Sequence, residues 1–407
     1  MIVFASLIKK LIEKIMKKNS KYIYFDHSAT TPVLPEVVKE INNCFTFYYG
    51  NASEPHSPGR KAKEILEHSR EVIGKSLGAK PKEIVFTGSG TESDNLAIIG
   101  VSEAYEKKGN HIITSEIEHP AVHMPLKKIA RRGFNVTYVP VDKFGMVDPQ
   151  DVKKSITDKT ILVTIMHANN IVGTIQPISE IGKILREHDI IFHTDAVQTF
   201  TNIKTDVNNL NVDLLSISGH KIYGPKGVGA LYIRKGTKIK PQILGGGHER
   251  GIRSSTENIP GIAGLAKAAE LGQKNLSDKI LKVTKMRDYL INSLLDKIDE
   301  VKFNGHPTER LPGNCNFSFK YIEGESIVLK LDLAGIVASS GSACSSSSLK
   351  PSRTLVSMGL SNQEAHGSLR ITLGFENTKE EIDYFLKVIP EIVSGLRKIS
   401  PLYKKTV

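Results

Sequence analysis

Cysteine is scarce in this sequence. Cys44, Cys315 and Cys344 are the three cysteines in 407 residues, and no two of them have CxxC spacing. So few cysteines give neither a disulfide framework nor a metal site of the zinc-finger kind. A small secreted scaffold is therefore excluded, no metal is expected, and a reducing compartment is the expected location.

The sequence also lacks a long hydrophobic run, a repeat or a long low-complexity segment. No stretch approaches 18 uninterrupted apolar residues, so no membrane-spanning helix and no integral membrane association are expected. Residues 1–20 are different, because apolar side chains from Phe4 to Ile15 share one helical face and lysines lie mostly opposite. We interpret this segment as a basic amphipathic extension or a translated upstream start. It lacks the features of a secretory signal, and membrane-surface binding or organellar targeting is the alternative to a plain cytoplasmic protein.

Most of the chain has little excess charge. The formal charge is +12, but residues 1–21 carry +5 and residues 395–407 carry +4. The body from 22 to 394 therefore carries only +3. A long basic groove for nucleic acid is not expected, and direct nucleic-acid binding is disfavoured.

Short apolar runs alternate with amphipathic helical stretches from residue 83 onward. The expected strands are 84–86, 112–114, 136–139, 161–165, 190–193 and 214–217, and the expected helices between them include 92–107, 120–132 and 178–188. This alternation predicts an α/β fold with a mainly parallel sheet covered on both faces.

The pattern changes near residue 275. A long helix over 274–301 is expected, followed by strands at 313–319 and 369–373 and helices from 325 and over 378–398. We predict an extension over 1–20, a large domain over 21–274 and a smaller α+β domain over 275–407. The first residues of the large domain are expected to pack on the small one.

Lys221 stands after an apolar strand and before the glycine-rich 224–229 segment. A lysine at a strand end can form a Schiff base if a cofactor phosphate lies beside it, although most lysines are solvated charges. The small residues 87–91, between a strand and a helix, can present backbone N–H groups to a phosphate, or can be an ordinary capped turn. Asp195, at another strand end, can hold a pyridine nitrogen protonated, or can be a helix cap.

Cys344 lies in the Ser/Gly-rich stretch 339–348. A cysteine in such a loop is a poor core residue and is a candidate nucleophile. Cys44 and Cys315 lie within apolar patterns, so we interpret both as structural.

Together these segments resemble the NifS/IscS-like cysteine desulfurases, which are pyridoxal-phosphate enzymes of fold type I in the class V aminotransferase family. This resemblance implies a large domain with a mainly parallel seven-stranded sheet and a smaller α+β domain. The resemblance covers about residues 22–402. The further matching segments are 24–32, 50–53 with His56 and 59–60, 118–122, 169–170, 218–227, 245–251, 339–344 and 400–402.

The resemblance implies a role for each matching residue. Lys221 would form the Schiff base with pyridoxal phosphate, Cys344 would be the nucleophile, and His119 would stack on the ring and act as an acid or base. The other implied cofactor contacts are Asp195 to the ring nitrogen, Gln198 to the ring hydroxyl, Asn170 beside the ring, Gly90, Thr91, Ser218 and His220 to the phosphate, and Thr256 to the phosphate of a neighbouring subunit.

The resemblance also implies a reaction and partners. Asn170 and Arg370 would bind the carboxylate of L-cysteine, and the products would be L-alanine and a persulfide on Cys344. The sulfur would then pass to an acceptor protein, such as an iron–sulfur scaffold, or serve tRNA thiolation. The contact through Thr256 implies a homodimer.

Several positions depart from the family pattern. Gly88-Ser89-Gly90 replaces Ser-Gly-Ala, and Ser89 would be mildly strained if its φ were positive. Ile171 replaces a glutamate, Gly374-Phe375-Glu376-Asn377 replaces Gly-Arg-Phe-Thr, and Lys350 replaces a glutamate. The substitution at Phe375 would remove a cation near the carboxylate site.

Two other functions remain open on the sequence alone. One is a selenocysteine lyase or a small-amino-acid aminotransferase on the same fold, although an aminotransferase does not need Cys344. The other is a sulfur carrier or scaffold with an inactive site, which the set of Lys221, Asp195 and His119 disfavours.

Overall fold

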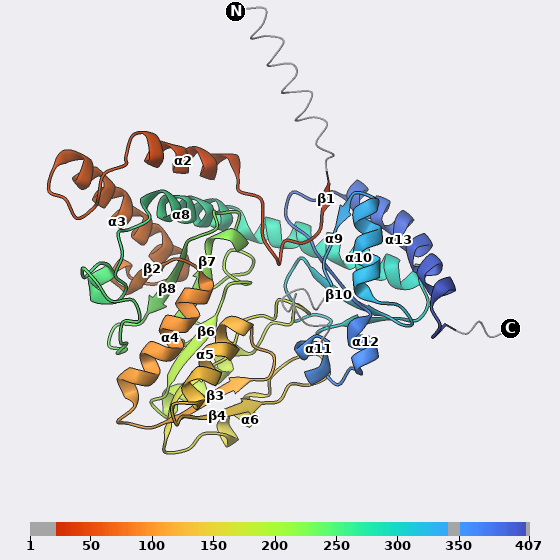
Figure 1. Cartoon of the computed structure of the whole chain (residues 1–407), viewed down its shortest axis with the longest axis horizontal. Helices are drawn as coiled ribbons and strands as arrows, with labels where there is room; N and C mark the ends of the chain where they lie inside the picture. Colours follow the sequence, from red (N-terminus) through yellow and green to blue (C-terminus); the bar gives the residue numbers. More distant parts are fainter. Residues whose placement is uncertain (1–21, 341–350, 404–407) are drawn as a thin grey trace, which may run out of the picture.

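A seven-stranded sheet forms the centre of the larger part of the molecule (Figure 1). The computed structural model describes residues 22–340 and 351–403. The strand order is β2-β8-β7-β6-β5-β3-β4, and only β8 runs antiparallel to its neighbours. The strands are β2 (Ile84–Thr87), β3 (His111–Ser115), β4 (Asn135–Val139), β5 (Thr160–Thr164), β6 (Ile191–Asp195), β7 (Leu214–Ser218) and β8 (Gly229–Ile233). The predicted α/β class with a mainly parallel sheet is confirmed.

The strands are apolar on both faces because helices cover both faces. Neighbouring residues such as Leu162 and Val163, or Leu214 and Leu215, belong to different hydrophobic clusters. This alternation follows from the two-residue period of a strand. One cluster packs against α4 (Gly90–Tyr105) and α5 (Pro120–Ala130). The other packs against α2 (Pro35–Thr46), α3 (Ser57–Leu77), α6 (Pro149–Lys154), α7 (Ile178–Glu187) and α8 (Ile259–Gln273).

A smaller α+β part follows α8 and contains two further sheets. The antiparallel sheet has the order β12-β10-β9, and β1 pairs in parallel with β11. The strands are β1 (Ile23–Tyr24), β9 (Val301–Asn304), β10 (Asn314–Phe319), β11 (Ile336–Val337) and β12 (Ser368–Thr372). The helices are α9 (Leu276–Lys297), α10 (Gly324–Leu333), α11 (Arg353–Ser357), α12 (Asn362–His366) and α13 (Lys379–Ile399). Phe25 is fully buried in the same cluster as residues 283–393, so the start of the described chain packs on this part.

The helix expected over 274–301 is too long at both ends. It begins at Leu276, after Asn275 with φ of 54°, and ends at Lys297, because Ile298 with φ of −133° and ψ of 115° is already extended. Ser89 has φ of −174°, which is ordinary extended backbone, so it carries no strain. Among residues 22–340 and 351–403, no helix combines the length and the apolar character that crossing a bilayer requires.

Candidate active site

Polar side chains from the ends of the parallel strands meet at one edge of the sheet and line a cavity of about 310 Å³. In open α/β sheets this edge is where ligands bind. Ten residues predicted from the sequence line this cavity, namely Gly90, Thr91, His119, Asn170, Asp195, Gln198, Ser218, His220, Lys221 and Arg370.

Lys221 enters the cavity from a short 3-10 turn, Gly219–Lys221, directly after β7. Its Nζ donates hydrogen bonds to the carbonyl oxygens of Ser28 (2.5 Å) and Ala29 (2.8 Å). Gln198 Nε2 donates to the same Ser28 oxygen at 3.0 Å. The segment after β1 therefore fixes the position of the Lys221 amine, which the sequence analysis predicts to form the Schiff base.

Asp195 ends β6 and its side chain is buried. Burial raises the pKa of its carboxyl group, and the neighbouring His119 ring, the Val197 N–H and the Lys221 amine oppose that rise. Oδ1 accepts a hydrogen bond from the Val197 N–H at 2.9 Å, and no ion pair within 4 Å involves Asp195 in the described ranges. A cation such as a protonated pyridine nitrogen would satisfy this carboxylate.

His119 caps the N-terminus of α5. Its Nδ1 accepts a hydrogen bond from the Ala121 N–H at 3.1 Å, so the ring proton of the neutral form is on Nε2. Burial lowers the pKa of His119, which favours that neutral form. The ring can therefore offer an N–H donor and a flat face to a ligand in the cavity.

The first turn of α4 forms a cradle for an anion. Ser89 caps this 16-residue helix, and its Oγ accepts a hydrogen bond from the Glu92 N–H at 3.1 Å. A Cβ atom at Gly90 would lie 2.7 Å from Val197 Cγ2 and 3.2 Å from Ser218 Cβ, so glycine keeps this space open. Helix N–H groups, Ser218 and nearby His220 are the donors a phosphate requires. The cradle and the buried Asp195 carboxylate fit pyridoxal phosphate.

Arg370, on β12, and Asn170, after β5, lie together in the lining of the same cavity. The Arg370 side chain is 3% exposed and donates from Nη1 to the Asn170 carbonyl oxygen at 3.0 Å. Its Nη2 forms an ion pair with Asp26 Oδ1 at 2.8 Å. Sequence reasoning identified Arg370 and Asn170 but gave no role to Asp26, although Asp26 lies within the matched 24–32 segment. A charged residue two positions after a short strand was the available signal.

Two predicted residues are not part of this cavity. Thr256 is exposed and lies outside it. Cys344 lies outside the described residues, but Ser339, before it, lines the cavity and exchanges two backbone hydrogen bonds with Arg370 (3.1 and 2.7 Å). Cys44 and Cys315 are fully buried, and burial raises their pKa values to about 11 and about 12, as expected for structural thiols.

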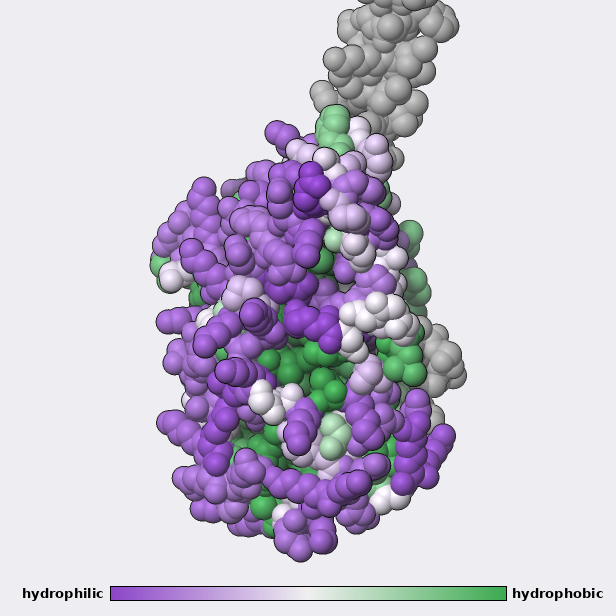
Figure 2. Space-filling model, turned by 90° about the vertical axis from the view of Figure 1, so that its left-hand side faces the viewer, coloured by the Kyte–Doolittle hydropathy of each residue, from purple (hydrophilic) through white to green (hydrophobic). Residues whose placement is uncertain are grey.

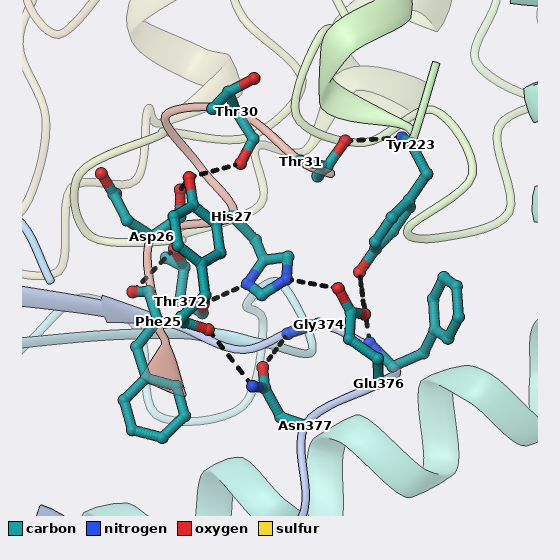
Figure 3. A network of polar contacts seen from close by, with 12 residues as sticks. Phe25, Asp26, His27, Thr30, Thr31, Tyr223, Thr372, Gly374, Glu376 and Asn377 are labelled. Atoms are coloured by element: carbon teal, nitrogen blue, oxygen red, sulfur yellow. Dashed lines mark hydrogen bonds and ion pairs between the residues drawn. The ribbon is translucent and has the colours of Figure 1, made fainter. Parts of the chain in front are cut away.

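The departure at 374–377 has a structural counterpart beside the cavity (Figure 3). Glu376 Oε1 lies 2.9 Å from His27 Nε2, and Oε2 accepts a hydrogen bond from the Tyr223 hydroxyl group at 2.7 Å. The cation expected at position 375 is therefore absent, and Glu376 at the next position supplies a carboxylate that has its own partners. A Cβ at Gly374 would lie 2.3 to 2.6 Å from all three side chains, so this network requires glycine at that position.

A mostly parallel seven-stranded sheet with a lysine, a buried carboxylate and a phosphate cradle at its carboxyl edge defines a pyridoxal-phosphate enzyme of fold type I. The family model described as Aminotransferase class-V matches residues 23–385. The chain is 52% identical to cysteine desulfurase IscS of Dictyoglomus turgidum over 383 residues, which are 94% of this chain and 97% of that protein. It is 51% identical to cysteine desulfurase IscS of Methanosarcina thermophila, covering 97% of each chain.

Solved structures agree with these relatives. A NifS-like protein superposes with a TM-score of 0.87 at 40% identity, covering 92% of this chain and all of the other. A NifS-like protein from Rickettsia africae gives a TM-score of 0.83 at 33% identity, covering 92% of this chain and 99% of the other. The chain belongs to the cysteine desulfurase family of the class-V aminotransferases, which are pyridoxal-phosphate enzymes.

Proposed function

We propose that this chain is an L-cysteine desulfurase that supplies sulfur for iron–sulfur cluster assembly or tRNA thiolation. The observation that carries the proposal is the single cavity that contains Lys221, Asp195, His119 and Arg370 and also includes Ser339, at the edge of the segment with Cys344. The net reaction converts L-cysteine and the Cys344 thiol into L-alanine and a Cys344 persulfide. Atoms and electrons balance, because the β-carbon gains the electrons that the two sulfur atoms lose.

Each residue of the cavity would have a separate role in this reaction. Bound pyridoxal phosphate would supply the electron sink for the pair released at the substrate Cα. Lys221 Nζ would remove and return protons at the substrate carbons, and the carbonyl oxygens of Ser28 and Ala29 are acceptors for it when it is protonated. Buried Asp195 would keep a cation on the ring nitrogen, and His119 would move a proton from Nε2.

Arg370 and Cys344 would act on the substrate itself. The guanidinium group of Arg370, beside the Asn170 carbonyl oxygen, would bind the substrate carboxylate and so orient the Cβ–S bond. The Cys344 thiolate would attack the substrate sulfur, which forms the S–S bond and breaks the C–S bond. The persulfide would then reach a sulfur acceptor, such as an iron–sulfur scaffold protein.

We further propose that the enzyme is a homodimer in which Thr256 contributes to the partner's cofactor phosphate. Thr256 is exposed, which a contact to another subunit requires. Hydrophobic residues gather in a hollow on the face seen in Figure 2. Leu244, in the segment that precedes Thr256, is 80% exposed. An apolar patch with a polar rim is typical of a subunit interface.

Location and domain limits are also proposals. The scarcity of cysteine favours the cytoplasm. The change of hydrophobic cluster between α8 and α9 supports a large domain over 21–274 and a small one over 275–407, with the first residues packing on the small domain. Residues 1–20 lie outside the described structure and stay an amphipathic extension by sequence pattern.

The decisive experiment compares wild type with Cys344→Ser, with Cys315→Ser as the matched control. We expect Cys344→Ser to stop alanine and persulfide formation while the bound cofactor keeps its visible absorption band, and Cys315→Ser to keep the activity. Lys221→Ala should lose the absorption band of the lysine-bound cofactor. Release of sulfide and alanine at the wild-type rate by Cys344→Ser would refute the persulfide route, and an oxo-acid product would indicate an aminotransferase instead.

A further inference from the structure

A carboxylate of the protein itself already binds Arg370. The Arg370 and Asp26 side chains are 3% and 16% exposed, and Asp26 Oδ1 lies 2.8 Å from Nη2. Both residues line the cavity that contains Lys221. The Asp26 carboxylate therefore occupies one donor position of the guanidinium group that the substrate carboxylate would use.

The backbone of Asp26 is fixed, so its side chain cannot simply drift away. Its carbonyl oxygen accepts hydrogen bonds from the Tyr24 hydroxyl (3.1 Å) and the Ala29 N–H (3.0 Å). The next residue, His27, is held on both ring nitrogens, with Nδ1 2.9 Å from the Thr372 carbonyl oxygen and Nε2 2.9 Å from Glu376 (Figure 3). These contacts tie the segment to β12 and the turn after it.

The His27 contacts also define the charges beside Asp26. A carbonyl oxygen only accepts, so Nδ1 carries a proton. Burial alone would raise the pKa of Glu376, but hydrogen bonds with His27 and Tyr223 lower it, so Glu376 is an anion beside the His27 ring. Glu376 is thus the carboxylate that contacts His27, and the Asp26 carboxylate is directed at Arg370.

We propose that Asp26 is a specificity-determining residue that competes with the substrate carboxylate for Arg370. This inference rests on the carboxylate-binding role proposed for Arg370. Asp26 keeps the buried guanidinium group paired and oriented when no substrate is bound. The substrate carboxylate must displace Asp26 or share Arg370 with it, so Asp26 weakens the binding of every ligand that carries a carboxylate. Binding of a ligand with a second anionic group is weakened still more.

The test uses holoenzyme and the Asp26→Asn variant, which keeps the size and one hydrogen-bond acceptor but removes the charge. Calorimetric titration would use L-alanine, which has a carboxylate, and ethylamine, which has none. We expect Asp26→Asn to bind L-alanine about tenfold more tightly and ethylamine within about twofold of wild type, as removal of one charged competitor predicts. The KM for L-cysteine should fall in parallel, and thermal unfolding would verify that the variant is folded.

Arg370→Gln separates this inference from the proposed function. If Arg370→Gln weakens L-alanine binding but Asp26→Asn binds it no more tightly than wild type, the competition is refuted and the role of Arg370 stands. Equal tightening of ethylamine would also refute it, because the effect would not concern the carboxylate. If Arg370→Gln leaves L-alanine binding unchanged, Arg370 does not bind the carboxylate and both ideas fail.

Discussion

Replacing Glu249 by alanine should destabilise this protein more than any exposed charge substitution. Glu249 and Arg70 form a buried bidentate ion pair, with both N–O distances at 2.8 Å and side-chain exposures of 3% and 4%. Glu249 also accepts a hydrogen bond from the Phe86 N–H on β2 at 2.9 Å. The pair thus joins α3, the sheet and the loop before Thr256.

The magnitude follows from the burial of the pair. Glu249→Ala leaves the Arg70 guanidinium group buried, with the Ile84 carbonyl oxygen at 2.8 Å and the half-exposed Glu67 carboxylate at 3.4 Å as remaining partners. Removing one partner of such a pair costs about 3–5 kcal/mol of unfolding free energy. The double variant Arg70→Met/Glu249→Leu removes both charges and should cost much less, because no unpaired ion remains.

Urea unfolding followed by circular dichroism measures this difference at one protein and cofactor concentration. The matched control is Glu64→Ala, since Glu64 pairs with Lys61 at 3.0 Å while 66% exposed. That exposed pair should contribute less than about 1 kcal/mol. The reasoning is refuted if Glu249→Ala costs no more than Glu64→Ala, or if the double variant is as unstable as the single one.

Three further predictions concern single residues. Burial raises the pKa of Glu118 from its ordinary 4.5 to about 8, so the folded state holds a proton that the unfolded state loses. The free energy of unfolding should therefore fall as the pH rises from 4.5 to about 8. Urea titrations at several pH values should show that Glu118→Gln removes roughly 1 kcal/mol per pH unit of this dependence. Gly90→Ala should weaken cofactor retention about tenfold, because its methyl group would lie 2.7 Å from Val197 Cγ2. By contrast, a Cβ atom at Gly395 would have no atom within 4 Å, so Gly395→Ala should retain the cofactor and unfold at a slightly higher urea concentration. A charged alkylating reagent should modify Cys44 and Cys315 only after unfolding, as peptide mass spectrometry would reveal.

The sequence was sufficient for features that depend on neighbouring residues. Strand ends can be read locally, so Asp195 and Lys221 could be placed at one edge of the sheet before the structure was known. The α/β alternation likewise predicts the layers, although the antiparallel β8 was not expected.

Contacts between distant residues could not be read in this way. The Asp26–Arg370 pair joins residues 344 positions apart, and the His27–Glu376 pair joins residues 349 apart. No period or local motif encodes such pairs. The sequence therefore shows that a cation is missing at Phe375, but it does not show that the carboxylate of Glu376 next to it has partners of its own.

The pairing of the first described residues with β12 has a consequence for synthesis of the chain. The Asp26 backbone pairs with Thr372, and Ser28 and Ala29 in the same segment hold Lys221. A ribosome releases the N-terminal segment first, yet its partner strand emerges almost last. The large sheet can therefore form during translation, while the support for the lysine is completed only after nearly the whole chain has been made. A truncated chain that lacks β12 should consequently fold its sheet but leave Lys221 without its two fixed carbonyl partners.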